Sequence, residues 1–403
     1  MSDFYTTVPD HVSPDLLGDY PLRRGRTSTE RPHDLIQKLQ DDETRRGWYV
    51  PTLFATTGGW VFRSMADNSL IGPDTEHFSN SASAPFGEMA GGTWRAVPND
   101  YDPPEHSWYR RVLNPMFVPR EMAKLDEKIR TYAEQYVGEF RDRGSCEFMQ
   151  DFAYKFPINI FLELMGLPQE RVDEFLEWER VLIHGDSLEE MKRSVCRVAQ
   201  YMEREILDHR VRPRDDLISR ALDAEVAGRR LNESEMLGLC FLLFLGGLDS
   251  VTTHMGFFFR HLAENPQHQA QLRADPTLID AAVEELMRAY SATTMQKLCV
   301  KDIEIGGIRI RAGDSVAVSG PLAGRDRAVF PDADVIRFDR KPRTISFGYG
   351  PHLCLGIHLA RRELRIALEA MLRCLPEFAI APGALIESRL GAIPQPMQVP
   401  LVW

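Results

Sequence analysis

A long apolar segment in the middle of the chain constrains the possible folds more than any other feature. Residues 237–248 carry almost no polar side chain, and Asp249 follows them directly. Residues 232–235, Asn-Glu-Ser-Glu, resemble a capping box that begins a helix, and Asn-Pro at 265–266 would end it. The predicted helix of about 33 residues is roughly 50 Å long. Because the apolar run is too short to span a bilayer, we expect a buried helix that crosses the molecule.

Helical patterns also dominate the rest of the chain. Three further segments with helical periodicity are residues 120–143, 168–183 and 188–211, and another helix begins at Asp275-Pro276. Strand patterns are fewer, and they cover residues 51–62, 298–310 (a hairpin around Gly306-Gly307) and 315–319. The sequence therefore predicts a mainly α fold with a minor, segregated β part. We expect a single domain over residues 1–403, with its β-rich parts mainly near 51–65 and 298–320.

Composition argues against several classes of protein. The 403 residues carry a formal net charge of −11, which disfavours nucleic acid as the main partner. Residues 1–49 contain no apolar run, so we expect neither a signal peptide nor a membrane anchor. The six cysteines form no Cys-x-x-Cys pair, which is typical of a reducing compartment. These features predict a cytoplasmic protein.

One cysteine differs from the others because of the loop that carries it. Cys354 lies in residues 347–356, Phe-Gly-Tyr-Gly-Pro-His-Leu-Cys-Leu-Gly, directly before a helical pattern. Backbone N–H groups and the dipole of a following helix stabilise a thiolate in such a position, and a thiolate is a strong axial ligand for haem iron. Two alternatives stay open. The residue is an incidental cysteine in a tight turn, or it is a zinc ligand, although no second cluster has a zinc-like spacing.

The same loop resembles, position for position, the haem-binding signature Phe-Gly-x-Gly-x-His-x-Cys-x-Gly of the cytochrome P450 monooxygenases. The resemblance implies the mainly helical P450 fold, with haem b between the long central helix and the helix after the cysteine loop. It implies that Cys354 ligates the iron. The signature residues that would surround the haem are Phe347, Gly348, His352 and Gly356.

A second match to the family lies before the cysteine loop. Glu285 and Arg288 fit its Glu-x-x-Arg motif, and residues 338–340, Phe-Asp-Arg, stand where the family has an arginine-bearing segment. In the family these groups form a buried network that holds the cysteine region, so the resemblance implies a structural role. Taken alone, Glu285 and Arg288 are an ordinary surface pair three residues apart on a helix.

The long helix carries the residues that the resemblance assigns to oxygen activation. Gly246-Gly247 interrupts its apolar run, which predicts a local widening of the helix; close packing against a neighbour is the alternative. The family has an acid–alcohol pair directly after this point, and here it is Asp249 and Ser250. The resemblance implies that Asp249 relays protons and that the Ser250 hydroxyl orders oxygen and water. Thr252 and Thr253 are an alternative register.

Basic side chains are needed to hold the two haem propionates. His106 and Arg110 lie four residues apart on one face of a helix that begins near residues 102–105. The family uses such a pair for propionates, and His352 and Lys297 would add further donors. A solvated helix face is the alternative for His106 and Arg110.

The likeness is strongest to the bacterial camphor-hydroxylase group. It implies a pocket for a small hydrophobic substrate, lined by Phe86, Trp94, Leu242, Leu245, Thr293, Ala392 and Ile393. Each of these residues is equally compatible with ordinary core packing. Two departures, Trp94 where camphor hydroxylase has a ketone-binding tyrosine and Met295 where it has an aspartate, argue against camphor itself. We therefore expect a related terpenoid or norisoprenoid ketone, such as an ionone-like compound.

The resemblance also implies a source of electrons outside the chain. It predicts a monomeric monooxygenase that uses O2 and a 2Fe–2S ferredoxin with its NADH-dependent reductase, and no membrane. The ferredoxin is acidic, so its docking surface would be basic, and the candidate residues are Arg111, Lys341, Arg361 and Arg362. Two alternatives are a peroxide-driven or isomerase-like enzyme of the same fold, which often lacks the acid–alcohol pair, and a non-catalytic haem-binding sensor.

Overall fold

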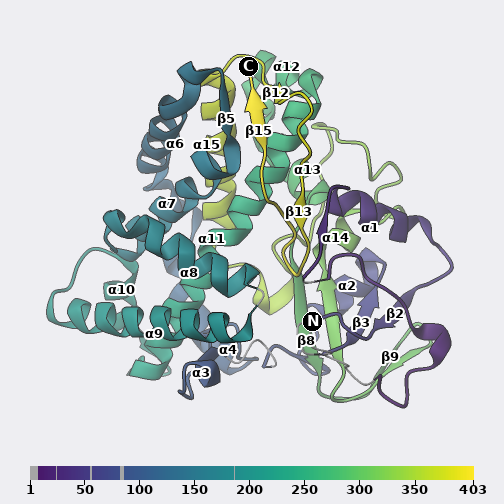
Figure 1. Ribbon diagram of the computed structural model, residues 1–403. Coiled ribbons are helices and arrows are strands. Elements are labelled where there is room, and N and C mark those ends of the chain that lie inside the picture. The colour runs from purple at the N-terminus through teal and green to yellow at the C-terminus, as the bar shows by residue number, and fades with distance from the viewer. Residues whose placement is uncertain (1–7, 24, 55–56, 82–85, 186) are drawn as a thin grey trace. The chain divides into compact units, whose positions relative to one another are not determined.

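The computed structural model describes residues 8–403 except 24, 55–56, 82–85 and 186 (Figure 1). Helices make up 53% of the chain, so the predicted mainly α fold with a smaller β part is confirmed. The chain divides into two compact units. The first comprises Met1–Ala82, Gly256–Cys354 and Glu377–Val402, and the second comprises Ser83–Met255, Leu355–Pro376 and Trp403.

The first unit contains the main sheet. Its strand order is β2-β3-β11-β8-β4, in which β11 is parallel to β3 and antiparallel to β8 (Figure 1). The strands are β2 Gly47–Val50, β3 Gly59–Phe62, β11 Ser315–Ser319, β8 Thr294–Cys299 and β4 Phe78–Ser79. All residues of β2, β3 and β11 are buried, because two apolar clusters that include Trp60 and Trp48 pack against them. The sheet is therefore part of a core rather than a solvent-exposed layer.

The remaining elements of the first unit are short. Its helices are η1 Pro14–Leu16, α1 Pro32–Asp41, α2 Met65–Ile71, α12 Pro266–Ala274, η6 Pro276–Leu278, α13 Ile279–Ala289, α14 Gly320–Gly324 and η7 Gly350–His352. Its other strands are β1 Thr27–Ser28, β9 Ile303–Ile305, β10 Ile308–Ile310, β12 Ala379–Ile380, β13 Ser388–Arg389, β14 Gln395–Pro396 and β15 Pro400–Val402. The predicted hairpin is confirmed as β9 and β10, and its turn residues Gly306 and Gly307 both have positive φ.

The second unit is almost entirely helical. Its helices are α3 Phe86–Met89, α4 Glu105–Leu113, η2 Asn114–Met116, α5 Pro119–Ala123, α6 Asp126–Phe140, η3 Arg141–Arg143, the π-helical η4 Met149–Ala153, α7 Lys155–Met165, η5 Gln169–Arg171, α8 Val172–His184, α9 Leu188–Val211, α10 Leu217–Asp223 and α15 Ile357–Cys374. Its strands are β5 Ser145–Glu147, β6 Glu225–Val226 and β7 Arg229–Arg230. One apolar cluster, from Trp94 to Leu248, forms its core.

The long helix α11, Glu233–Glu264, begins in the second unit and matches the predicted range. The capping box is present: Glu235 N donates to Asn232 Oδ1 at 2.9 Å, and Asn232 N donates to Glu235 Oε2 at 2.8 Å. Among the described residues it is the one helix long and apolar enough to cross a membrane, and 67% of its apolar window is buried within the protein. That burial is expected of a core helix.

The prediction of one helix over residues 120–143 is wrong. The chain forms α5, α6 and η3 instead. At the first break Lys124 N bonds to Glu121 O and Leu125 N to Met122 O, so the backbone tightens to bonds between residues three apart. The Met122 side chain is buried in the core of the second unit, and the tighter turn keeps it there. The helix predicted over 188–211 is confirmed as α9.

Candidate functional site

The cysteine loop of the first unit is held in a conformation that only glycine permits. Gly348 and Gly350 have φ of +75° and +78°. A Cβ on Gly350 would lie 2.6 Å from Pro73 Cα, which is too close for any other residue. Cys354 N donates to Phe347 O at 2.8 Å and closes the loop, and His352 ends the short helix η7 within it. The loop therefore has a defined shape that presents Cys354.

Cys354 is exposed and stands three residues before α15, whose N-cap is Gly356. The other cysteines differ. Cys146, Cys240 and Cys299 are buried, and desolvation raises the pKa of these thiols to about 12, 12 and 11. Neutral, buried thiols are poor metal ligands and poor nucleophiles. Cys354 is the one exposed cysteine of the six, and its loop sequence predicts that it is the iron ligand.

Glu285 and Arg288 form a buried network, not a surface pair. Both side chains are fully buried, and Arg288 donates to both carboxylate oxygens of Glu285 at 2.9 and 2.8 Å. Arg340 donates to the same carboxylate at 3.1 Å and to Asp332 at 2.9 Å. Arg288 also donates to the backbone oxygens of Gly324 and Ala333. Every one of these contacts lies in the first unit.

This network reaches the cysteine loop through α13. Ser346, the residue before Phe347, donates its hydroxyl to Met287 O at 2.8 Å, between the two residues of the motif. Gly348 N donates to Ile345 O at 2.8 Å on the other side. The carboxylate and guanidinium groups therefore fix the backbone that leads into the loop, which is the structural role that the sequence predicts.

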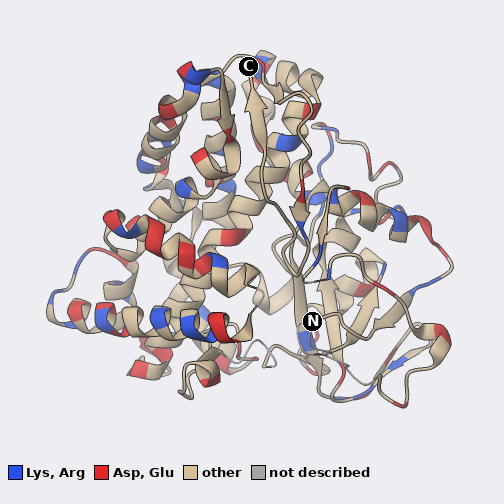
Figure 2. Ribbon diagram, in the orientation of Figure 1, with Lys and Arg blue, Asp and Glu red and all other residues tan. Residues whose placement is uncertain are grey.

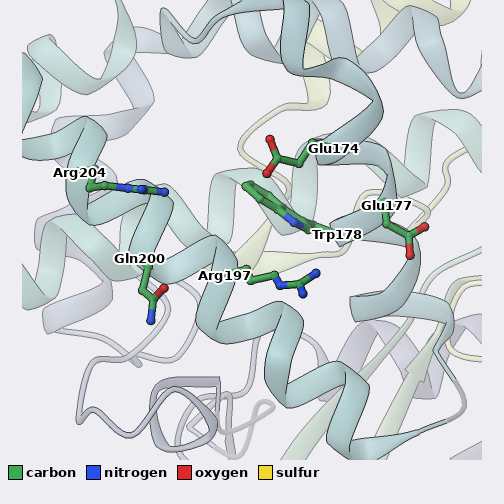
Figure 3. A pocket seen from close by; sticks show the side chains of 6 residues that line it. All are labelled: Glu174, Glu177, Trp178, Arg197, Gln200 and Arg204. Atoms are coloured by element: carbon green, nitrogen blue, oxygen red, sulfur yellow. The ribbon is translucent and has the colours of Figure 1, made fainter.

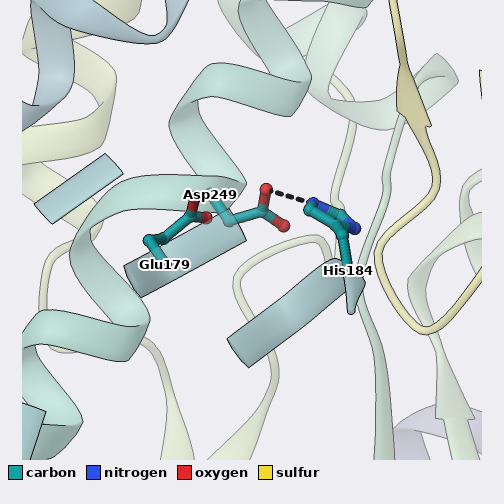
Figure 4. A group of neighbouring side chains, drawn as sticks. All are labelled: Glu179, His184 and Asp249. Carbon is teal, nitrogen blue, oxygen red and sulfur yellow. Dashed lines mark hydrogen bonds and ion pairs between the residues drawn. The ribbon is translucent and has the colours of Figure 1, made fainter. Parts of the chain in front are cut away.

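Asp249, the predicted proton donor, is held by a histidine from another helix of the second unit. Asp249 is 2% exposed, and its Oδ1 lies 2.8 Å from Nε2 of His184, the last residue of α8 (Figure 4). Glu179, also on α8 and buried, completes a group whose ligand atoms lie within 4.8 Å of one another. His184 and Glu179 were not predicted from the sequence, because no motif marks them and 65 residues separate His184 from Asp249.

Hydrogen bonds distinguish Ser250 from Thr252, which is one of the two threonines of the alternative register. Ser250 is half-buried beside Asp249. Thr252 is buried, and its hydroxyl donates to the backbone oxygens of Ala153 and Leu248, both at 3.0 Å. A hydroxyl bound in this way stabilises helix packing. The contacts of Thr252 argue against this threonine as the relay alcohol, and Ser250 and Thr253 stay as the candidates.

The predicted widening of α11 at Gly246-Gly247 is not present. The helix is α-helical without a break from Glu233 to Glu264. Glycine permits a distortion but does not impose one, because the hydrogen bonds of the regular helix can continue through it. A Cβ on Gly247 would lie 3.0 Å from a ring carbon of Phe161, so this glycine allows α7 to pack closely. The alternative of close packing is therefore the one that holds for Gly247.

The basic residues predicted for the propionates lie in both units. In the second unit His106, 2% exposed, and the half-buried Arg110 lie one turn apart on α4, and Arg110 Nε donates to Asn114 Oδ1 at 2.8 Å. In the first unit Lys297, 2% exposed, lies on β8 opposite Val316 of β11, and His352 is half-buried. The predicted helix start near residues 102–105 is confirmed.

The residues predicted for the substrate pocket also divide between the units. In the second unit Trp94 and Phe86 lie 4.8 and 5.2 Å from the ring of Phe241, and Leu245 packs on the same cluster; Leu242 is half-buried. In the first unit Ala392 O accepts from Thr294 N, next to Thr293, and Ile393 is half-buried. The Trp94 group is thus an aromatic cluster within the core of the second unit, with Trp94 itself 7% exposed.

The residues predicted for partner docking differ in how their charge is used. Arg111 and Lys341 are exposed, and Arg361 is half-buried. Arg362 donates to both oxygens of Asp126 on α6 at 2.6 Å, so its charge is neutralised within the second unit. Arg362 therefore links α15 to α6 through an ion pair.

A pocket that the sequence did not predict lies between α8 and α9. It has a volume of about 330 Å³, and its lining residues are Glu174, Glu177, Trp178, Arg197, Gln200 and Arg204 (Figure 3). Acidic and basic residues both lie along these two helices (Figure 2). Five of its six lining side chains are charged or polar, so it is unsuited to a hydrocarbon.

Comparison with known proteins gives consistent results. A family model described as "Cytochrome P450" matches residues 159–376. The chain is 34% identical over 383 residues to "Probable cytochrome P450 127A1" of Sinorhizobium fredii, covering 93% of the chain and 92% of the relative. Among solved structures it is similar to CYP101J2 (29% identity, TM-score 0.87, 99% of both chains) and CYP101C1 (30% identity, TM-score 0.87, 98% and 100%).

Proposed function

The chain belongs to the cytochrome P450 family of monooxygenases, with haem b as its cofactor, and we propose that it hydroxylates a C–H bond of a small terpenoid or norisoprenoid ketone. Its structural neighbours belong to the camphor-hydroxylase-like group, which supports this substrate class. The observation that carries the haem-thiolate assignment is the cysteine loop, in which two glycines of positive φ and the bond from Cys354 N to Phe347 O give the backbone around Cys354 a defined shape.

The residue types present are those that a haem-thiolate site uses. Cys354 would supply the axial sulfur. His106 and Lys297, which can carry positive charge, are each 2% exposed, and buried cationic donors are what two propionate carboxylates require. Arg110 and His352 would add two further donors. When bound, haem supplies the reductive activation of O2 and the transfer of one oxygen atom to the substrate.

The proton chemistry belongs to α11. We assign Asp249 the role of proton donor, with the proton held at its carboxyl group, and Ser250 the role of the hydroxyl that receives and passes it on. The bond from His184 Nε2 to Asp249 Oδ1 fixes the rotamer of the acid. Burial of Asp249 limits exchange of this proton with bulk solvent, which keeps proton transfer tied to the reaction.

The substrate would contact the aromatic cluster around Trp94. The indole Nε1–H is the donor that could bind a ketone oxygen, and Phe86, Phe241 and Leu245 provide apolar contact. A panel of terpenoid and ionone-like ketones, titrated for the spectral shift that accompanies loss of water from haem iron, tests this assignment. Binding by linear alkanes or macrolides but by none of these ketones would contradict it.

The remaining parts of the proposal concern partners and location. We propose a cytoplasmic monomer that receives electrons from a 2Fe–2S ferredoxin with an NADH-dependent reductase. Arg111, Lys341 and Arg361 are the candidate contacts, since their charge is opposite to that of an acidic ferredoxin. Arg362 contributes less because Asp126 already neutralises it.

A pair of experiments tests the function. Purified protein is reduced under carbon monoxide, and its Soret band is compared with those of thiolate-ligated and imidazole-ligated standards. A thiolate-type band is expected, and an imidazole-type band would remove the assignment of Cys354. NADH-driven hydroxylation should then require ferredoxin and reductase. Equal product from hydrogen peroxide alone would identify a peroxide-driven enzyme instead.

A further inference from the structure

The group formed by Glu179, His184 and Asp249 has the composition of a metal site. It combines one imidazole nitrogen and two carboxylates from two helices of the second unit, α8 and α11 (Figure 4). The three residues are 5%, 9% and 2% exposed. Of the residues that the structure describes, no other three histidine, cysteine or acidic side chains come together in this way. We propose that these three residues bind a divalent transition metal, with Zn²⁺ as the ion that fits them best.

The distances allow one ion to reach all three ligands. The ligand atoms lie within 4.8 Å of one another, so some point lies within about 2.8 Å of each of them. Zinc binds nitrogen and oxygen at about 2.0–2.2 Å. Each ligand therefore moves by well under about 1 Å, which small side-chain rotations provide.

The ligand types select the metal. Imidazole nitrogen and carboxylate oxygen are both zinc ligands, and three protein ligands leave the fourth tetrahedral position for a water molecule. Mg²⁺ and Ca²⁺ prefer six or more oxygen ligands and keep several waters, which a cluster this buried does not offer. Imidazole also favours Zn²⁺ over these ions. A divalent cation would in addition compensate two buried carboxylates that lie close together.

Binding would change the hydrogen bond between His184 and Asp249. His184 Nε2 and Asp249 Oδ1 are 2.8 Å apart, a hydrogen-bonding distance. Two ligands of one tetrahedral zinc ion lie about 3.4 Å apart. The ion would therefore replace the hydrogen bond and engage the nitrogen and oxygen that formed it. His184 is the last residue of α8, and a helix end opens locally more readily than its interior, which provides a route of entry.

This site predicts reversible inhibition, a consequence that rests on the proposed function of Asp249. A carboxylate bound to zinc cannot carry the proton for oxygen activation. Zinc should therefore lower NADH-driven hydroxylation, and a chelator should restore it. Binding itself does not depend on turnover, so it can be measured whether or not Asp249 is the proton donor.

The test uses the full-length, haem-loaded protein without a histidine tag. After treatment with a chelator it is titrated with Zn²⁺ by calorimetry, and bound zinc is measured by elemental analysis after desalting. One zinc per chain is expected. Glu179→Gln and His184→Gln, each on a fold verified by the carbon monoxide spectrum and by Tm, should weaken binding about tenfold or more.

A matched control is His77→Gln. His77 also lies 2.8 Å from a carboxylate, that of Asp74, but it belongs to no three-ligand group among the described residues. Its substitution should leave zinc affinity unchanged. The proposal is overturned if the wild-type protein binds no zinc, if both cluster variants bind it as tightly as wild type, or if His77→Gln removes the binding. If zinc binds but does not affect hydroxylation, the metal site is supported, and only the role of Asp249 as proton donor is contradicted.

Discussion

Two buried clusters of acidic and basic side chains, one in each unit, use similar residues for different ends. In the first unit Glu285 is bound by Arg288 and Arg340, and guanidinium N–H groups also reach backbone oxygens. In the second unit Asp249 is bound by His184, with Glu179 beside it. The first cluster lies on and beside α13, which bonds to Ser346 before the cysteine loop, and the second joins α8 to the long helix α11.

The basic partner explains the difference. A guanidinium group is charged at any relevant pH and offers donors in a rigid, planar arrangement, so the network around Glu285 is permanent. An imidazole gains or loses its charge within the physiological range and binds metals when neutral. The first cluster is therefore suited to hold a backbone in place. The second is suited to chemistry in which protons or ions move.

The largest expected effect comes from breaking the permanent network. Arg288→Ala leaves the buried carboxylate of Glu285 with Arg340 as its remaining guanidinium partner. We therefore expect a loss of about 3–5 kcal/mol in the free energy of unfolding, together with poor haem retention. Denaturant unfolding and haem content measure this. The control is Arg180→Ala, because Arg180 pairs with Glu177 at the same spacing but exposed. It should cost about 0–1 kcal/mol, and equal losses in the two variants would contradict the comparison.

The second largest expected effect is a loss of activity on removing the acid of the second cluster, Asp249. Asp249→Asn keeps the shape of the side chain and removes the acid, so hydroxylation should slow about 100-fold, as for loss of a general acid. The dissociation constant of the substrate and the free energy of unfolding should change little. Stopped-flow kinetics and substrate titration measure both. A variant as active as wild type would exclude the relay through Asp249.

A smaller effect is expected from the residue that orients the acid. His184→Gln can still reach Asp249 but lacks the rigid imidazole ring, and turnover should fall about tenfold, in keeping with the weakening of one hydrogen bond. Excess peroxide release per NADH should accompany it. His77→Gln is the control. If His184→Gln unfolds the protein as Arg288→Ala does, the second cluster is structural like the first.

The smallest effect is expected at a third carboxylate, which combines capping with a half-exposed ion pair. Arg229 donates to both oxygens of Glu235 at 2.6 Å and, with Asn232 N and Tyr109, lowers the pKa of Glu235 to about 2. Glu235→Gln should cost about 1 kcal/mol at neutral pH. The folded pKa is depressed, so this stability is present above the ordinary value of 4.5 and is lost as pH falls from there towards about 2. Denaturant unfolding of both proteins at several pH values measures the difference, which should shrink on acidification.

Much of the fold was predictable from local patterns. The capping box and the Asn-Pro stop located α11, and the paired glycines located the β9–β10 hairpin. These signals are local because they depend on hydrogen bonds between residues near in sequence. The break between α5 and α6 was not predictable in this way, because residues 123–126, Ala-Lys-Leu-Asp, contain no glycine or proline that would mark it. The role of Gly247 in α11 was not predictable from local patterns either. It allows close packing of Phe161, which belongs to another helix.

The spacing of Cys354 and its glycines, together with the acid–alcohol pair on a long apolar helix, identifies the family from local patterns alone. The role of each charged pair depends instead on contacts that form only on folding. Glu177 and Arg180 have the same spacing as Glu285 and Arg288, yet one pair is exposed and the other fully buried. His184 meets Asp249 only because α8 and α11 pack together. The physical reason is that burial, which sets the strength of an ion pair and the reactivity of an acid, depends on contacts between segments far apart in the chain.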